Sequence, residues 1–140
     1  MKIVIGIDVG ISTTKIIGIN EEGRVLSPIR IKATDPVTSL YGAFGKYLYD
    51  NKIQLGDVEK VMLTGVGAAY IDKAVYGLPT GKSEEFIANG LGARYETGLE
   101  RMMVVSMGTG TSIVKCDHDE ILHLGGIGIG GGTLQGLSRL

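Results

Sequence analysis

Three glycine-rich turns, each directly after an apolar run, are the segments of this sequence best suited to chemistry. They are residues 8–12 (DVGIS), 108–111 (GTGT) and 125–132 (GGIGIGGG). Such a turn places backbone N–H groups at a strand end, where they can bind phosphate oxygens. Any one of them could be an ordinary hairpin turn, because glycine is the default turn residue. Three of them, two with Ser or Thr beside the glycines, favour binding of a polyphosphate.

The first turn also carries charged side chains. Asp8 offers a carboxylate to Mg²⁺ or to its water ligands, and Lys15 offers a cation to a phosphate group. A carboxylate and a cation on either side of a glycine turn are the groups that a magnesium–phosphate complex needs.

Two phosphate motifs of other folds are the alternatives to this interpretation. Gly126, Gly128 and Gly131 satisfy the dinucleotide pattern G-x-G-x-x-G, but a lone match is weak. The acidic residue expected about 20 positions later would lie past Leu140, so it cannot test the match. The pattern G-x-x-x-x-G-K-[ST] does not occur, which excludes a P-loop.

Glu84 and Glu85 stand at an expected helix start, directly after Gly81-Lys82-Ser83. Acidic residues in a first turn commonly serve only to complement the helix dipole. A carboxylate at the mouth of a cleft can instead act as a general base. Spacing alone favours the first explanation and leaves the second open.

Composition narrows the classes of protein that these residues can belong to. The chain has 140 residues, 44% of them hydrophobic, and a net charge of −1, so it has no basic excess for a nucleic acid. No apolar run reaches the ~18 residues of a membrane span. With a single cysteine, Cys116, there is no internal disulfide, as is usual in the cytoplasm. Two histidines make a histidine zinc site improbable.

The expected elements begin with an antiparallel meander and end with a glycine-rich hairpin. Apolar runs predict strands at 2–7, 13–19, within 25–33, at 61–63, 102–107, 112–116 and 121–124. A helix is predicted from Asp35 as N-cap and Pro36 as first residue to about Asn51. Shorter helices are expected at 68–75, from Ser83 or Glu84, and from Leu134, with Thr133 as its cap.

The helix that begins near Glu84 is expected to pack closely on a sheet. Phe86, Ile87, Leu91 and Tyr95 are predicted on its inner side. Gly90 and Gly92 lower helix propensity by ~1 kcal/mol each, which suggests that the helix needs them for close packing.

The order of elements through residue 107 is β-β-β-α-β-α-β. A meander followed by crossovers indicates an α/β fold with a mixed sheet covered by helices. It differs from the uniform strand–helix alternation of a dinucleotide-binding domain.

Two stretches carry a resemblance to a known family. Residues 8–15 (DVGISTTK) resemble the D-x-G-G-T-x-x-K phosphate motif of the actin/hexokinase-type ATPase superfamily. Residues 106–112 (SMGTGTS) and 125–137 (GGIGIGGGTLQGL) resemble the type II, eukaryotic-like pantothenate kinases. The first motif is shared by the superfamily, whereas the last is specific to the family, and the resemblance covers the whole chain.

The resemblance implies a function and a fold. This family transfers the γ-phosphate of MgATP to pantothenate, the first step of coenzyme A synthesis, with ATP between two ribonuclease H-like halves. Residues 1–140 would be the first of these lobes plus the start of the second glycine-rich segment, without the C-terminal lobe and inactive alone. The alternatives are another small-molecule kinase, an activator ATPase of the superfamily, or a non-catalytic nucleotide-sensing module.

It also implies roles for particular residues. Lys82-Ser83-Glu84-Glu85-Phe86 matches the family's acidic pattern before a helix, which makes Glu85, or else Glu84, the catalytic base. Asp8 would hold Mg²⁺. The expected ATP-binding residues are Asp8, Gly10, Ser12, Thr13, Lys15, Gly108, Thr109, Gly110, Thr111, Gly130, Gly131 and Gly132, and the expected pantothenate-binding residues are Ser112, His123 and Gly125.

The sequence departs from the family pattern at Ile11 and at His123. Ile11 replaces a second glycine, so its backbone must avoid positive φ or be strained. His123 stands where an arginine often contacts the pantothenate carboxylate, which makes binding weaker and pH-dependent. The resemblance further implies inhibition by coenzyme A or acyl-coenzyme A, a homodimer at full length, and a cytoplasmic enzyme.

Overall fold

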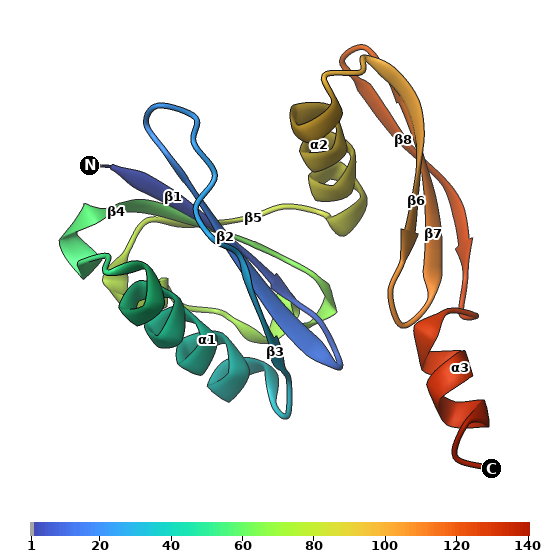
Figure 1. Cartoon of the computed structure of the whole chain (residues 1–140), viewed down its shortest axis with the longest axis horizontal. Helices are drawn as coiled ribbons and strands as arrows, with labels where there is room; N and C mark the ends of the chain where they lie inside the picture. Colours follow the sequence, from blue (N-terminus) through green and yellow to red (C-terminus); the bar gives the residue numbers. More distant parts are fainter. Residues whose placement is uncertain (1) are drawn as a thin grey trace. The chain divides into compact units, whose positions relative to one another are not determined.

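The computed structural model describes residues 2–140 of the chain. These residues form two compact units, one ending at Ser83 and the other spanning Glu84–Leu140. Each unit contains its own sheet (Figure 1).

The first unit is a five-stranded mixed sheet with a helix on one face (Figure 1). The strand order is β3-β2-β1-β4-β5, with β1, β2 and β3 antiparallel and with β4 and β5 parallel to β1. This confirms the predicted α/β class and the meander at its start. The elements are β1 (Ile3–Val9), β2 (Thr13–Asn20), β3 (Ile29–Lys32), α1 (Pro36–Asn51), β4 (Val58–Thr64) and β5 (Thr80–Lys82).

Alternation along β1 divides its side chains between two faces. Ile3, Ile5, Ile7 and Val9 are at most 1% exposed and belong to the core under α1, whereas Asp8 points to the opposite face. The helix contributes Leu40, Ala43, Phe44 and Tyr47 to the same core. The strand that anchors this unit therefore also displays the carboxylate.

Helix α1 begins and ends as the sequence predicts. The Asp35 carboxylate accepts a hydrogen bond from the backbone N–H of Thr38 at 2.7 Å, and Pro36 is the first helical residue. Hydrogen bonds from Thr38 lower the pKa of Asp35. The helix ends at Asn51, followed by Lys52 in the left-handed conformation (φ 56°).

The segment between β4 and α2 differs from expectation. Two 3₁₀ turns, Val66–Tyr70 and Val75–Gly77, replace the single helix predicted at 68–75, and a third turn, Leu55–Asp57, precedes β4. Strand β5 was not predicted, because its three residues have no apolar pattern. It is held by parallel pairing with β4, including a hydrogen bond from the Ser83 N–H to the Leu63 carbonyl at 2.9 Å.

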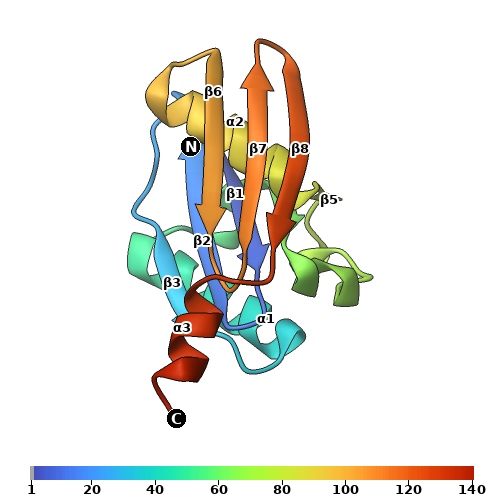
Figure 2. The ribbon, with the colours of Figure 1, turned by 90° about the vertical axis from the view of Figure 1, so that its right-hand side faces the viewer.

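The second unit is a three-stranded antiparallel sheet with α2 on one face (Figure 2). Its elements are α2 (Glu85–Thr97), β6 (Arg101–Met107), β7 (Thr111–Asp117), β8 (Glu120–Ile127) and α3 (Gly131–Leu137). We expected 102–107 to close the first β-β-β-α-β-α-β order. It opens this second sheet instead, because its tight hairpin with β7 pairs it locally.

The inner side of α2 was predicted only in part. Phe86 and Ile87 are half-buried, but Leu91 and Tyr95 are 51% and 54% exposed, so placing them inward was wrong. Gly90 faces the sheet: a Cβ there would lie 2.8 Å from Ile121 Cγ2 and 3.1 Å from Cys116 Sγ. The prediction of close packing thus holds for Gly90 and fails for Gly92, where a Cβ would meet nothing within 4 Å.

Thr133 is the third residue of α3 and not its N-cap, which is Gly130. Its hydroxyl accepts a hydrogen bond from the Gly130 N–H at 3.2 Å, so it caps the helix from within. None of the helices in residues 2–140 has the length and apolar character needed to cross a membrane.

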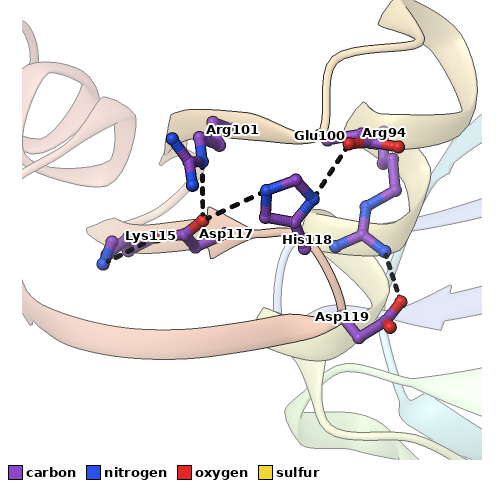
Figure 3. A network of polar contacts seen from close by, with 7 residues as sticks. All are labelled: Arg94, Glu100, Arg101, Lys115, Asp117, His118 and Asp119. Atoms are coloured by element: carbon purple, nitrogen blue, oxygen red, sulfur yellow. Dashed lines mark hydrogen bonds and ion pairs between the residues drawn. The ribbon is translucent and has the colours of Figure 1, made fainter.

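A network of polar side chains joins the β7–β8 turn to the start of β6 (Figure 3). The Asp117 carboxylate accepts from Arg101 Nε at 3.0 Å and pairs with Lys115 Nζ at 3.3 Å. The hydrogen bond from Lys115 and the nearby Arg101 guanidinium lower the pKa of Asp117. His118, in the left-handed conformation, pairs with Glu100 at 2.9 Å. These exposed contacts fix the turn and contribute little to stability individually.

The two glycines of α2 give a matched test of this packing. We expect Gly90→Ala to lower the free energy of unfolding, because overpacking costs about 1–3 kcal/mol and exceeds the gain in helix propensity. Gly92→Ala should raise it by roughly 0.5–1 kcal/mol, since only the propensity changes. Urea unfolding of both variants measures the difference. Equal stability of the two variants would contradict the contact between α2 and β8.

Candidate functional site

The β1–β2 turn is closed by a backbone hydrogen bond that only glycine permits. The Gly10 N–H donates to the Thr13 carbonyl at 3.1 Å, and a Cβ on Gly10 would lie 2.6 Å from that oxygen. Ile11, at the tip, is 71% exposed and is not among the residues with positive φ. The strain that a side chain at this position could have caused is therefore avoided.

Asp8 and Lys15 meet across the first two strands. They are register partners in the β1–β2 ladder, and Lys15 Nζ lies 2.7 Å from Asp8 Oδ2. The Asp8 side chain is 24% exposed and that of Lys15 53%. Because exposed ion pairs contribute only ~0–1 kcal/mol, Lys15 can exchange its carboxylate partner for a phosphate at little cost. Ser12 lies in the turn and Thr13 begins β2, so all five residues predicted here flank one hairpin.

A second turn, residues 64–67 (TGVG), packs on the end of β1 and was not assigned to the site from sequence. Thr64 is the register partner of Asp8 in the parallel β1–β4 ladder. Gly65 has φ 86°, and a Cβ there would clash with Asp8 Oδ1 and lie 2.7 Å from the Val9 carbonyl oxygen. A Cβ on Gly67 would lie 2.7 Å from the same oxygen. The pattern Thr-Gly-x-Gly after a buried strand was the sequence feature that could have revealed it.

The structure joins the second and third glycine-rich segments, which are separate in sequence. The N–H groups of Gly131 and Gly132 donate to the carbonyls of Gly108 and Thr109 at 2.8 and 3.2 Å. The Thr111 hydroxyl donates to the Ile129 carbonyl at 2.8 Å. Residues 108–111 and 128–132 therefore form one glycine-rich assembly at the end of the second sheet.

Close backbone approach explains why this assembly is rich in glycine. A Cβ on Gly110 would lie 2.9 Å from the Ile127 carbonyl oxygen, and one on Gly130 would lie 2.7 Å from that of Thr109. Because Gly131 and Gly132 already donate within the chain, these two residues support the 108–111 turn. We infer no direct phosphate contact from their N–H groups.

The two candidate bases lie at the start of α2. Glu84 is its N-cap residue, whose carbonyl accepts from the Ala88 N–H at 3.0 Å, and Glu85 is the first helical residue. Both are exposed. The N-terminal end of a helix stabilises a carboxylate.

Phe86 links this end of α2 to the predicted substrate residues. Its ring stacks on that of His123 with centroids 5.6 Å apart and planes at 29°. His123 is the register partner of Val114, and Ser112 lies two residues earlier on β7. Since β7 alternates, Ser112 shares the face of Val114 that α2 covers. Gly125, with φ 153°, lies at the bulge of β8 beside this face.

No group of three or more His, Cys, Asp or Glu side chains able to hold a metal ion occurs among residues 2–140. The predicted site residues divide between the units, with Asp8 to Lys15 in the first and Glu84 to Gly132 in the second.

Comparison with known proteins identifies relatives of the sequence. No protein-family model matches the chain. Curated Bacillus proteins named type II pantothenate kinase are 27–31% identical to it. The one from Bacillus anthracis is 31% identical over 148 residues, which cover 100% of this chain and 49% of that protein. The chain thus spans about half the length of the curated relatives it matches.

Comparison with solved structures places the fold. Component A of the (R)-2-hydroxyglutaryl-CoA dehydratase of Acidaminococcus fermentans gives a TM-score of 0.73 at 14% identity, covering 88% of this chain and 47% of that one. The activator of the 2-hydroxyisocaproyl-CoA dehydratase of Clostridium difficile, with bound ADPNP, gives 0.72 at 17%, covering 86% and 45%. The chain shares the fold of these two solved structures, and it is similar over its whole length to proteins named type II pantothenate kinase.

Proposed function

We propose that this chain is the nucleotide-binding part of a kinase that transfers the γ-phosphate of ATP to pantothenate. The observation that carries the proposal is the Asp8–Lys15 pair at the glycine turn of β1 and β2. It provides a cation and a carboxylate at the end of a buried strand, which are the groups that bind and orient a metal-complexed phosphate. Similarity to named pantothenate kinases along the whole chain supports the choice of substrate.

ATP is the proposed nucleotide. A solved structure of similar fold carries ADPNP, an ATP analogue. In this chain Gly10, Ser12, Thr13 and Lys15 would bind phosphate oxygens through the first hairpin. Gly108, Thr109, Gly110 and Thr111 would do so through the second hairpin, which Gly130, Gly131 and Gly132 support.

The residues around Asp8 fit Mg²⁺. This ion keeps several water ligands and needs only one or two carboxylates together with substrate phosphates. Asp8 supplies the carboxylate, and beside it the buried hydroxyl of Thr64 has no hydrogen-bond partner within the described residues. When bound, Mg²⁺ neutralises charge that develops on the phosphate oxygens.

Glu85 is the proposed base, with Glu84 as the alternative. Its carboxylate would accept the proton of the pantothenate hydroxyl as that oxygen attacks the γ-phosphate. Ser112, His123 and Gly125 would bind pantothenate, with the His123 ring held by Phe86 and contacting the substrate carboxylate. A protonated His123 would bind that carboxylate more strongly than a neutral one.

Other expectations from the resemblance remain predictions. They are inhibition by coenzyme A or acyl-coenzyme A, a homodimer at full length, and a cytoplasmic location. Residues 1–140 alone are expected to bind ATP weakly, because the relatives are about twice as long.

An activator ATPase is the second candidate, since two solved proteins of similar fold are dehydratase activators or components. The two functions differ in the fate of the γ-phosphate. A kinase transfers it to an added alcohol, whereas an activator ATPase releases it to water.

The first prediction from the proposed function concerns the substrate. The full-length protein, given MgATP and a panel of pantothenate, pantetheine and sugars, should phosphorylate pantothenate, detected as phosphopantothenate by mass spectrometry. Phosphate release that no acceptor changes would support the activator instead. Phosphorylation of a sugar alone would support a kinase activity but exclude pantothenate as the substrate.

A second prediction separates the two charges of the first hairpin. Lys15→Ala should raise KM for ATP by about 10- to 100-fold, because a charged hydrogen bond to phosphate is lost. Asp8→Asn should mainly lower kcat, by roughly 10²-fold or more, because the charge that holds the cation is removed. Lys46→Ala is the control, since it removes the exposed Lys46–Asp50 pair of α1. If neither site variant differs from this control in steady-state kinetics, the hairpin does not bind phosphate.

A third prediction distinguishes the two glutamates. Glu85→Gln keeps the shape of the side chain and removes the proton acceptor, so kcat should fall about 10²- to 10⁴-fold with little change in substrate binding. Glu84→Gln should have a far smaller effect, because Glu84 is the N-cap residue with extended backbone and its side chain points away from that of Glu85. The reverse pattern would assign the base to Glu84. If both variants keep the wild-type kcat but have lower thermal midpoints, the two glutamates only complement the helix dipole.

A further inference from the structure

Thr64 ends β4 on the face of the sheet that carries Asp8. Val61 and Leu63 are buried in the core under α1, so the alternation of β4 turns Thr64 to the opposite face. Its register partner in the parallel ladder is Asp8, whose other neighbour is Lys15. Thr64, Asp8 and Lys15 therefore form a row in the register. It crosses the adjacent strands β4, β1 and β2, which Figure 1 shows.

The hydroxyl of Thr64 is buried and has no hydrogen-bond partner within residues 2–140. Buried polar groups in native proteins almost always have a partner, because an unpaired one has lost its contact with water without replacement. A hydroxyl beside a charged carboxylate is in a polar environment, where an oxygen from outside the chain can supply that contact.

Thr14 is a second threonine whose buried hydroxyl lacks a partner in the described chain, and it provides a contrast to Thr64. However, Thr14 is 0% exposed and pairs in register with Val9, on the core face. Apolar side chains surround that face, so no ligand reaches it. The two threonines differ in the face on which they lie.

The turn after Thr64 is shaped around the carboxylate. Gly65 has φ 86°, and any Cβ there would clash with Asp8 Oδ1. A Cβ on Gly67 would lie 2.5 Å from Val9 Cγ1. Because two glycines let this turn lie directly against Asp8 and Val9, the position of Thr64 relative to the carboxylate is fixed by backbone packing.

We propose that Thr64 is a positioning residue for the divalent cation that accompanies the nucleotide. Its hydroxyl oxygen accepts a hydrogen bond from a water of the hydrated cation held at Asp8. The inference rests on the proposed function, since it takes Asp8 as the cation's carboxylate. It adds the β4 turn to a site otherwise built from the β1–β2 hairpin.

Binding of Mn²⁺ in the presence of ADP tests the proposal without relying on turnover. Mn²⁺ takes the same oxygen ligands as Mg²⁺ and is observed directly by electron paramagnetic resonance. Thr64→Val in the full-length protein keeps the side-chain shape and should weaken Mn²⁺ binding about 10-fold, as expected for the loss of one hydrogen bond to a charged group. Thr64→Ser should restore most of the affinity. Thr14→Val is the matched control and should bind like the wild type.

The ligand-free thermal midpoint provides a second readout. Thr64→Val should match or exceed the wild type, because an unpaired buried hydroxyl is removed. A clear fall would show that the hydroxyl bonds within the folded chain and would overturn the proposal. The proposal would also be overturned if Thr64→Val bound Mn²⁺ as tightly as Thr14→Val does while Asp8→Asn bound it more weakly. Equal Mn²⁺ binding by wild type and Asp8→Asn would instead refute the proposed phosphate site.

Discussion

The first unit depends on the pairing of β1 with both β2 and β4. Four of its side chains, from Ile3 to Val9, fill the core under α1, and the residue between the last two is Asp8. A shift of one residue in this register would bury the carboxylate and expose the isoleucines. The hydrophobic energy that holds the sheet together thus also fixes the chemical group at its edge. The core thus positions Asp8, whose side chain lies on the opposite face of the sheet.

In the second unit the corresponding constraint is the close packing of one backbone segment against another, which glycine permits because it has no side chain. A Cβ on Gly110, Gly126 or Gly130 would lie less than 3 Å from a backbone oxygen of another segment and would clash with it. Such contacts join residues 108–111 to residues 128–132. The long glycine run of the sequence is therefore explained mainly by packing. Phosphate binding needs only the shorter turn that this packing shapes.

Local sequence patterns predicted much of the fold, and contacts between distant segments were harder to foresee. Apolar, β-branched runs predicted β1 and β2, and Asp35-Pro36 predicted the start of α1. Strand β5 has three residues, and its formation depends on the edge offered by β4. Leu91 and Tyr95 follow a helical repeat, yet α2 turns Gly90 to the sheet, because only a residue without a side chain fits against Ile121. The first hairpin was assigned from its motif, whereas residues 64–67 need the parallel β1–β4 pairing to join it.

Departures from ordinary backbone and side-chain preferences gather where β1 and β4 end. Gly65 has positive φ, the Thr64 hydroxyl lacks an internal partner, and Ile11 exposes a large apolar side chain at the tip of the hairpin. The unpaired Thr64 hydroxyl and the exposed Ile11 side chain each lower stability relative to an obvious substitution, and neither is required by the core under α1. Sequences that otherwise agree with their fold tend to break such rules at functional sites. In open α/β sheets the carboxyl ends of the strands are where ligands bind. The local structure thus points to the same end of the sheet as the charges of Asp8 and Lys15, by an argument that does not use the motif.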